Sequence, residues 1–119
     1  MTKCLICENT LIIDSLSCEA CHTTYKSKFS FPRSARLSLN EQRLAESLIL
    51  HGGNLKEMAV SLDVSYPTLK KRLNELSSSL EEKKAEDEKK IEEVLFDIES
   101  GKMSAEEGIK LIREINGEL

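Results

Sequence analysis

Residues 53–73 read GNLKEMAVSLDVSYPTLKKRL, and this stretch decides the fold of the central region of the chain. Apolar residues recur at helical spacing from Leu55 to Leu62. After a short break the pattern restarts behind Ser65, a residue type that caps helices, with Pro67 in the first turn. The stretch therefore predicts two helices joined by a tight turn, which is the arrangement of a helix-turn-helix.

The second helix of this pair, expected from Tyr66 to Leu76, has two chemically different sides. Its leucines recur at helical spacing and are expected to face inward. A helix that lies in the major groove of DNA contacts bases with its N-terminal residues and phosphates from its flanks. On this geometry the candidates for base contacts are Ser65, Tyr66, Thr68 and Lys70, the candidates for phosphate contacts are Lys71 and Arg72, and Asn74 can reach either. The alternative is that Lys70 to Arg72 form an ordinary solvated face.

A supporting helix is expected before the pair. Ser38 and Glu41 form a capping box that begins it, and Gly52-Gly53 end it after about His51. Its buried side is expected to consist of Leu39, Leu44, Leu48 and Ile49. The three helices together predict a helix-turn-helix domain over residues 36–78.

Two Cys-x-x-Cys pairs near the N-terminus predict a metal site. They consist of Cys4 with Cys7 and Cys18 with Cys21, and ten residues separate the pairs. Four thiolates make a tetrahedral site of soft ligands, which suits a structural Zn²⁺ and leaves no open position for a substrate. Strand-forming residues lie between and after the pairs, so residues 1–30 are expected to form a zinc ribbon built on a β-hairpin. An iron–sulfur cluster and a redox-active pair are the alternatives, and His22 is expected to be a surface residue.

The segment that follows the cysteines mixes cations with aromatic residues. It contains Lys26, Lys28, Arg33, Arg36 and Arg43 together with Phe29 and Phe31, and its only acidic residue is Glu41. Such a mixture can line the backbone of a nucleic acid. The alternative is a connector whose phenylalanines dock the ribbon on the helical region while the cations stay solvated.

The last third of the chain, residues 79–119, is acidic and helical in pattern. Residues 80–119 carry 7 Lys+Arg against 13 Asp+Glu, a net charge of −6, whereas residues 1–79 carry 10 against 8, or +2. The serines at 77–79 are expected to close the helix-turn-helix, and a charged helical stretch follows to Ser100. Gly101 is expected to end it, and Ser104 with Glu107 to begin a last helix.

These two amphipathic helices predict a C-terminal α-hairpin. A hairpin of this size is too small to bury both of its apolar stripes alone. It is therefore expected to form a homodimer or a higher homo-oligomer, or to dock on another protein.

Composition limits the remaining possibilities. Aromatic residues make up 4% of the chain and Trp is absent, so several small modules are expected rather than one large core. No apolar run approaches the roughly 18–20 residues of a membrane span, and no signal-peptide pattern is present, so a cytoplasmic protein without membrane contact is expected. The sequence offers no nucleophile–base pair, phosphate-binding glycine loop or open metal site, so an enzyme is not expected.

Several of these motifs resemble a known family. The run Gly53-Asn54-Leu55-Lys56, with Ser65-Tyr66-Pro67-Thr68 and Arg72-Leu73 behind paired cysteines, is similar to the family called domain of unknown function 2089, small prokaryotic proteins regarded as transcriptional regulators. The helix pair also resembles the helix-turn-helix of the Fis and enhancer-binding activator proteins, and the C-terminal hairpin resembles a short C-terminal (SHOCT-like) domain. In one departure from the usual Cys-Pro-x-Cys-Gly ribbon turn, Leu5 follows Cys4 and Glu8 follows Cys7.

The sequence thus predicts a mainly α protein with a small N-terminal zinc ribbon, a three-helix helix-turn-helix domain and a C-terminal α-hairpin. The expected function is that of a sequence-specific transcriptional regulator that binds double-stranded DNA as a homo-oligomer. The alternative is a protein-interaction adaptor that binds a partner through the ribbon or the hairpin and does not contact DNA.

Overall fold

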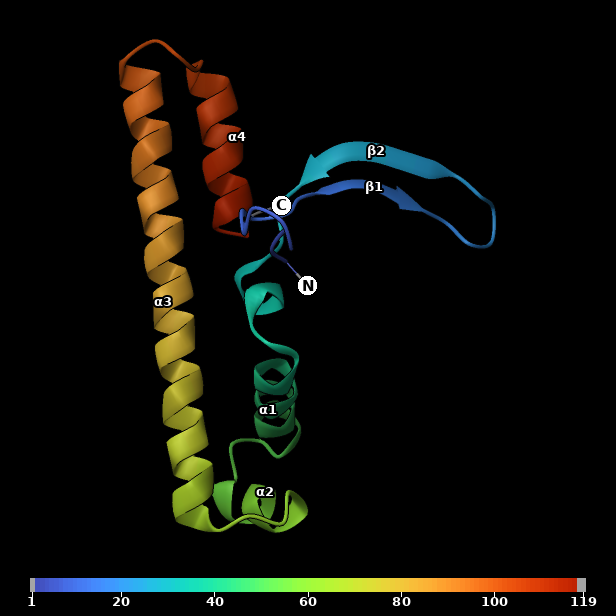
Figure 1. Cartoon of the computed structure of the whole chain (residues 1–119), viewed down its shortest axis with the longest axis vertical. Helices are drawn as coiled ribbons and strands as arrows, with labels where there is room; N and C mark the ends of the chain where they lie inside the picture. The colour runs from blue at the N-terminus through green and yellow to red at the C-terminus, as the bar shows by residue number, and fades with distance from the viewer. Residues whose placement is uncertain (1, 118–119) are drawn as a thin grey trace. The chain divides into compact units, whose positions relative to one another are not determined.

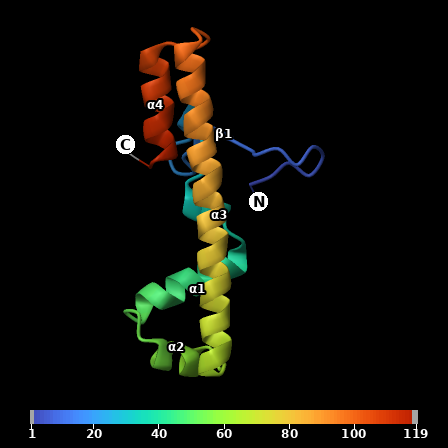
Figure 2. The same ribbon diagram turned by 90° about the vertical axis from the view of Figure 1, so that its left-hand side faces the viewer.

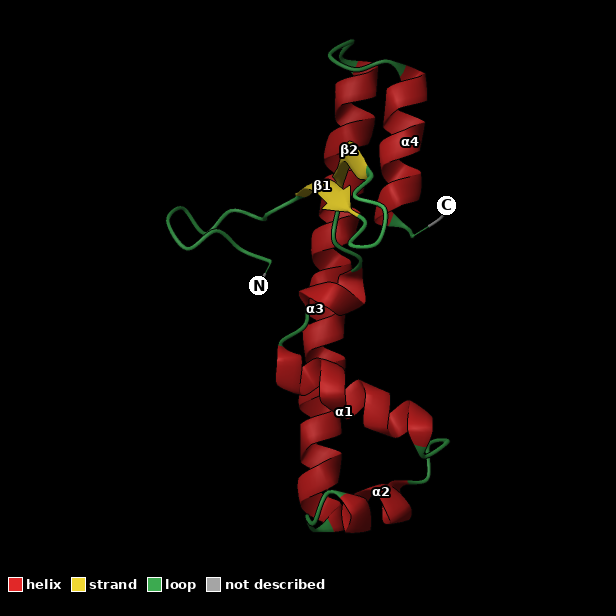
Figure 3. Cartoon of the chain, turned by 90° about the vertical axis from the view of Figure 1, so that its right-hand side faces the viewer, coloured by secondary structure: helices red, strands yellow, loops and turns green. Residues whose placement is uncertain are grey.

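The structure, a computed structural model, describes residues 2–117 and is mainly helical, with one small antiparallel sheet near the N-terminus (Figures 1 and 3). The chain divides into two compact units. One comprises residues 33–86, and the other comprises the residues before and after that range. The predicted fold class is confirmed.

The sheet consists of β1 (Ile13–Ser17) and β2 (Thr24–Phe29). The strands pair antiparallel, with Leu16 opposite Tyr25, and the register is irregular between Ile13 and Ser15. Every residue of β2 is exposed, and β1 contains no buried residue. The predicted β-hairpin is therefore present, but burial of its own side chains contributes little to its stability, and an isolated two-stranded sheet is marginal in water.

The core of the second unit lies where α1 (Leu39–Leu50), α2 (Leu55–Ser61) and the first turns of α3 (Tyr66–Glu99) meet (Figure 2). Met58 and Leu69 are fully buried, and the small residue Ala59 is buried beside them. The partly buried residues that pack against this cluster are Leu44, Leu48, Leu55, Val64 and Leu73. The predicted three-helix arrangement is confirmed, and the α3 residues Leu69 and Leu76 are buried as expected.

The N-terminus of α1 has the predicted capping box. Ser38 Oγ accepts a hydrogen bond from Glu41 N at 3.2 Å, and Ser38 N donates to Glu41 Oε1 at 3.1 Å. Two residues predicted on the buried side of this helix are in fact exposed, Leu39 by 62% and Ile49 by 77%. Leu39 is the first residue of the helix, and Ile49 lies about 100° around the helix from the core-facing Leu48, since each residue turns by that angle.

The predicted break at residues 77–79 is wrong, because α3 is continuous over 34 residues from Tyr66 to Glu99. A serine in the interior of a helix costs less than about 0.7 kcal/mol relative to alanine. No Gly or Pro follows the serines until Gly101, so no strong helix breaker ends the helix earlier. Leu76 is buried immediately before the serines. An ion pair between Arg36 Nη1, in the 3₁₀ helix η1 (Arg33–Arg36), and Glu86 Oε2 at 3.6 Å also holds this segment of α3.

The C-terminal part of α3 and the whole of α4 (Ala105–Ile115) form the predicted α-hairpin. These two segments lie side by side in Figures 1 and 2. Gly101 ends α3 with a φ of 78°, and Ser104 Oγ caps α4 by accepting a hydrogen bond from Glu107 N at 3.2 Å. Gly108 is buried where the helices approach, and a Cβ at this position would collide with the side chain of Ile98. None of the helices in the described chain combines the length and the apolar character needed to cross a bilayer.

Candidate nucleic-acid interface and paired cysteines

Ser65 fixes the start of the predicted recognition helix. Thr68 N donates a hydrogen bond to Ser65 Oγ at 3.3 Å, and the Ser65 hydroxyl donates to Thr68 Oγ1 at 2.7 Å. Ser65 therefore uses its hydroxyl proton inside the protein and acts first as a helix cap. Thr68 accepts in this pair, so its own hydroxyl proton and its methyl group remain available to a ligand.

The polar residues of the first turns of α3 face solvent. All seven residues predicted to contact DNA are exposed: Ser65, Tyr66, Thr68, Lys70, Lys71, Arg72 and Asn74. By contrast, Leu69 is fully buried and Leu76 nearly so. The orientation expected of a recognition helix is therefore present, with leucines inward and polar side chains outward. Contact with DNA itself stays a prediction.

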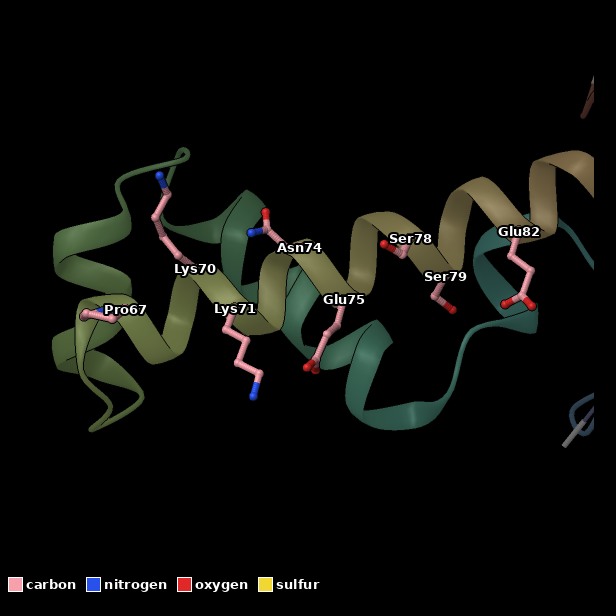
Figure 4. Close-up of a pocket in the computed structure, with 8 residues that line it drawn as sticks. All are labelled: Pro67, Lys70, Lys71, Asn74, Glu75, Ser78, Ser79 and Glu82. Atoms are coloured by element: carbon pink, nitrogen blue, oxygen red, sulfur yellow. The ribbon is translucent and has the colours of Figure 1, made fainter.

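Residues along the first turns of α3 line a shallow depression (Figure 4), and we call this lining the recognition stripe. Three of the predicted residues belong to it, namely Lys70, Lys71 and Asn74. Within the stripe, Lys70 and Asn74 project to one side of the helix and Lys71 to the other (Figure 4). The complete lining is Pro67, Lys70, Lys71, Asn74, Glu75, Ser78, Ser79 and Glu82.

Arg72 does not belong to the recognition stripe. It lines a second depression, the arginine groove, together with Arg43 of α1. The other residues of this groove are Ser38, Asn40, Glu41, Leu44, Leu62, Glu75 and Leu76. The groove brings a cation of the supporting helix beside a cation of the recognition helix, a pairing that was not expected from the sequence.

Glu41 belongs to the arginine groove and lies near the start of α1, and its carboxyl group is influenced by residues of α3. A hydrogen bond from the side chain of Ser79, hydrogen bonds from Ser38 and the positive charge of Lys83 lower the pKa of the Glu41 carboxyl below its ordinary value of 4.5. The ionised carboxylate therefore caps α1 and is stabilised by residues of α3 at the same time.

Glu75 is one of several residues of this surface that were not predicted from the sequence to contact DNA. It is exposed and lines both the recognition stripe and the arginine groove. The signal was available in the sequence, because Glu75 follows Lys71 by four residues and Arg72 by three, which places it beside both cations on a helix.

The two cysteine pairs form two matching turns. In the first, Glu8 N donates to Cys4 O at 3.0 Å and Cys4 N donates to Asn9 O at 2.9 Å. In the second, His22 N donates to Cys18 O at 2.9 Å and Cys18 N donates to Thr23 O at 2.8 Å. Each pair thus builds the same hydrogen-bonded turn around its first cysteine.

The residue after the second cysteine of each turn has a left-handed backbone. Glu8 has a φ of 59° and His22 a φ of 60°. The usual ribbon turn has glycine at this position, which adopts such angles without strain. The departure noted in the sequence therefore leaves the turn intact, at a cost of about 1–2 kcal/mol for each non-glycine residue.

Two of the four thiols are shifted toward the thiolate form. Hydrogen bonds from the backbone of Cys7 and Ile6 lower the pKa of Cys4, and a contact of 3.0 Å with the Thr23 hydroxyl is the main cause of the lowered pKa of Cys21. The thiolate is the form that binds metal, so the donors suit zinc. Over residues 2–117, however, the structure does not gather three or more Cys, His, Asp or Glu side chains into a metal-binding group. The zinc site stays a prediction.

The helices α1 and α2 and the exposed face of the first turns of α3 form a helix-turn-helix. Residues 37–83 match a family model described as Domain of unknown function (DUF2089)-HTH, which confirms the resemblance inferred from the sequence over these residues. The match contains α1, α2 and the first half of α3, and therefore the recognition stripe and the arginine groove. Comparisons of the chain with curated proteins and with solved structures gave no match.

Proposed function

We propose that this protein is a sequence-specific transcriptional regulator that binds double-stranded DNA through exposed residues between Ser65 and Asn74, three of which belong to the recognition stripe. The observation that carries the proposal is the orientation of α3, whose leucines are buried while its first polar turns are exposed, within a segment that matches a helix-turn-helix family. A recognition helix presented in this way enters the major groove with its N-terminal turns.

The geometry divides the proposed contacts by chemistry. Thr68, Lys70 and Asn74 have the donors, acceptors and methyl group that read base edges, and Tyr66 lies beside them at the start of the helix. Lys71 and Arg72 contribute positive charge to the phosphates on the flanks of the groove. Ser65 acts mainly by capping the helix that carries them.

A structural Zn²⁺ in the N-terminal ribbon belongs to the proposal. Its ligands are Cys4, Cys7, Cys18 and Cys21, which lie in two turns with the same hydrogen-bond pattern. The β-hairpin, whose turn contains Cys18 and Cys21, has no buried residue in its strands, so a bound metal would supply the stability that side-chain burial does not.

Self-association through the C-terminal α-hairpin is also proposed. After α4 has packed against the end of α3, the large apolar side chains of Leu95, Phe96 and Ile109 still remain about half exposed or more. A second copy of the hairpin would cover them, and a two-fold dimer would present two recognition helices to a two-fold-related DNA site.

The test of the DNA-binding proposal compares two double variants of the full chain on duplexes selected from a random library. Lys70→Ala with Lys71→Ala removes two charges of the recognition stripe, whereas Lys89→Ala with Lys90→Ala removes two exposed charges of the same helix outside the matched segment. The first variant is expected to bind at least about tenfold more weakly and to show a salt dependence reduced by about 1–2 in slope. Equal affinities of the two variants would contradict the proposal.

A second candidate function rests on the first cysteine turn. Leu5 and Ile6, between Cys4 and Cys7, are exposed by 83% and 94%. An apolar tip of this kind suits contact with another protein and supports the adaptor alternative. Binding of a partner by apolar contact would vary little with salt, whereas DNA binding weakens steeply as salt rises.

A further inference from the structure

The proposed DNA-binding surface contains an acidic residue whose position calls for a specific role. Glu75 lies one helical turn after Lys71, and both side chains project to the same side of α3 (Figure 4). The recognition stripe therefore changes the sign of its charge between Lys71 and Glu75, and Glu82 extends the acidic region further along the helix.

Glu75 is free to act on a ligand. Its side chain is exposed, and within the described residues it forms no ion pair with Lys71 or Arg72, although both are close in sequence on the same helix. Pairing inside the helix therefore does not occupy the carboxylate. A duplex that lies on the recognition stripe meets this negative charge directly.

The chemistry of the major groove leaves few partners for a carboxylate. Phosphates repel it, and so do the acceptor atoms of guanine and thymine. Hydrogen-bond donors are offered only by the amino groups of cytosine and adenine, and the N7 acceptor of adenine lies next to its amino group. Cytosine is therefore the base that suits an exposed carboxylate.

Building on the DNA-binding function proposed above, we infer that Glu75 is a specificity-determining residue, which accepts a hydrogen bond from the N4 amino group of a cytosine at a fixed position of the site. The same charge opposes binding wherever a phosphate or another base would face it. Lys71 and Glu75 thus act in opposite senses, since the lysine attracts every duplex and the glutamate selects among them.

The experiment selects binding sites from a random duplex library with three forms of the full chain: wild type, Glu75→Ala and Glu82→Ala. Alanine removes both the charge and the hydrogen-bond acceptor, whereas glutamine would keep an amide oxygen that can still accept from cytosine. Glu82→Ala is the matched control, because it makes the same change on the same stripe, about two helical turns away. The wild type and the control are expected to enrich sites with a cytosine at one position, and replacing that cytosine should weaken their binding about tenfold. Glu75→Ala should keep the rest of the motif and lose this penalty.

Two results would overturn the inference. If Glu75→Ala enriches the same cytosine as the wild type, the carboxylate does not read it. If Glu75→Ala binds every duplex more tightly by the same factor and leaves the base preference unchanged, the carboxylate only repels phosphate. A wild type that enriches no motif at all would instead refute the DNA-binding proposal. Helical content measured by circular dichroism checks that all three forms fold alike.

Discussion

The N-terminal β-hairpin and the helix-turn-helix differ in what holds them together. The helix-turn-helix buries Met58 and Leu69 completely, whereas every residue of β2 is exposed. Burial of apolar area stabilises the first region directly, at about 25 cal/mol per Å². Within the described residues, the strands of the second region bury no side chain. Packing can therefore specify the first region, whereas we propose that the second depends on a metal held by its cysteines.

The largest effect is expected from removal of the proposed zinc. Cys18→Ser, or addition of a chelator, should unfold the β-hairpin, because zinc bound to a structural site of this kind contributes about 10–16 kcal/mol. Amide resonances of residues 2–30 should collapse in a two-dimensional NMR spectrum while those of α1 and α2 stay in place. Elemental analysis of the wild type should give one zinc for each chain.

His22→Ala is the control for this prediction, because His22 is expected to lie beside the metal and not to bind it. An intact β-hairpin in chelator-treated protein, or a wild type without bound metal, would remove the proposed difference between the two regions.

The next effect concerns the packed region. Leu69→Ala removes a fully buried side chain and should lower the free energy of unfolding of the helix-turn-helix by about 2–5 kcal/mol. Val60→Ala is the control, since Val60 is 81% exposed and its truncation should change stability by less than about 0.5 kcal/mol. Urea titrations followed by circular dichroism measure both. A similar loss in the two variants would show that the core lies elsewhere.

Local patterns predicted this packed region well. Helical spacing identified Met58, Ala59 and Leu69 as inward-facing, and the capping box at Ser38 gave the start of α1. Helical spacing and capping boxes depend on residues only a few positions apart, so they can be recognised in the sequence. The exposure of Ile49 shows the limit, since one step of about 100° along a helix separates a core position from a solvent position.

Features that depend on weak preferences or on distant partners could not be predicted in the same way. The serines at 77–79 looked like a boundary, but their small cost is overridden by the helix around them. Arg72 and Lys71 are neighbours in sequence and line different depressions, and the groove that Arg72 shares with Arg43 requires two helices to meet. Whether the four cysteines share one ion likewise depends on two turns far apart in the chain.

A smaller effect tests whether packing also holds the C-terminal α-hairpin. Gly108→Ala places a methyl group against Ile98, and the overlap should cost about 1–3 kcal/mol, partly offset by the roughly 1 kcal/mol by which alanine favours a helix over glycine. Adding Ile98→Val makes room and should restore some of the loss. Thermal unfolding of the single and double variants measures this. An unchanged melting temperature in Gly108→Ala would show that the helices do not approach closely at this point.

The smallest effect tests how much a polar interaction contributes to the stability of the helix-turn-helix, apart from its apolar packing. Hydrogen bonds and Lys83 lower the pKa of Glu41 in the folded protein below its ordinary value of 4.5. A carboxyl with a depressed pKa contributes stability above its unfolded pKa, and this contribution is lost as the pH falls through the folded pKa. The free energy of unfolding should therefore decrease as the pH is lowered from about 5 to the folded pKa. Glu41→Gln should remove some of that slope. Stability at neutral pH should fall by less than about 1 kcal/mol, because glutamine can still accept the capping hydrogen bond from Ser38 N. Glu46→Gln is the control, because Glu46 is exposed on the same helix. It should leave the pH slope and the stability at neutral pH unchanged. Identical pH profiles for wild type and Glu41→Gln would mean that packing alone accounts for the stability of this region.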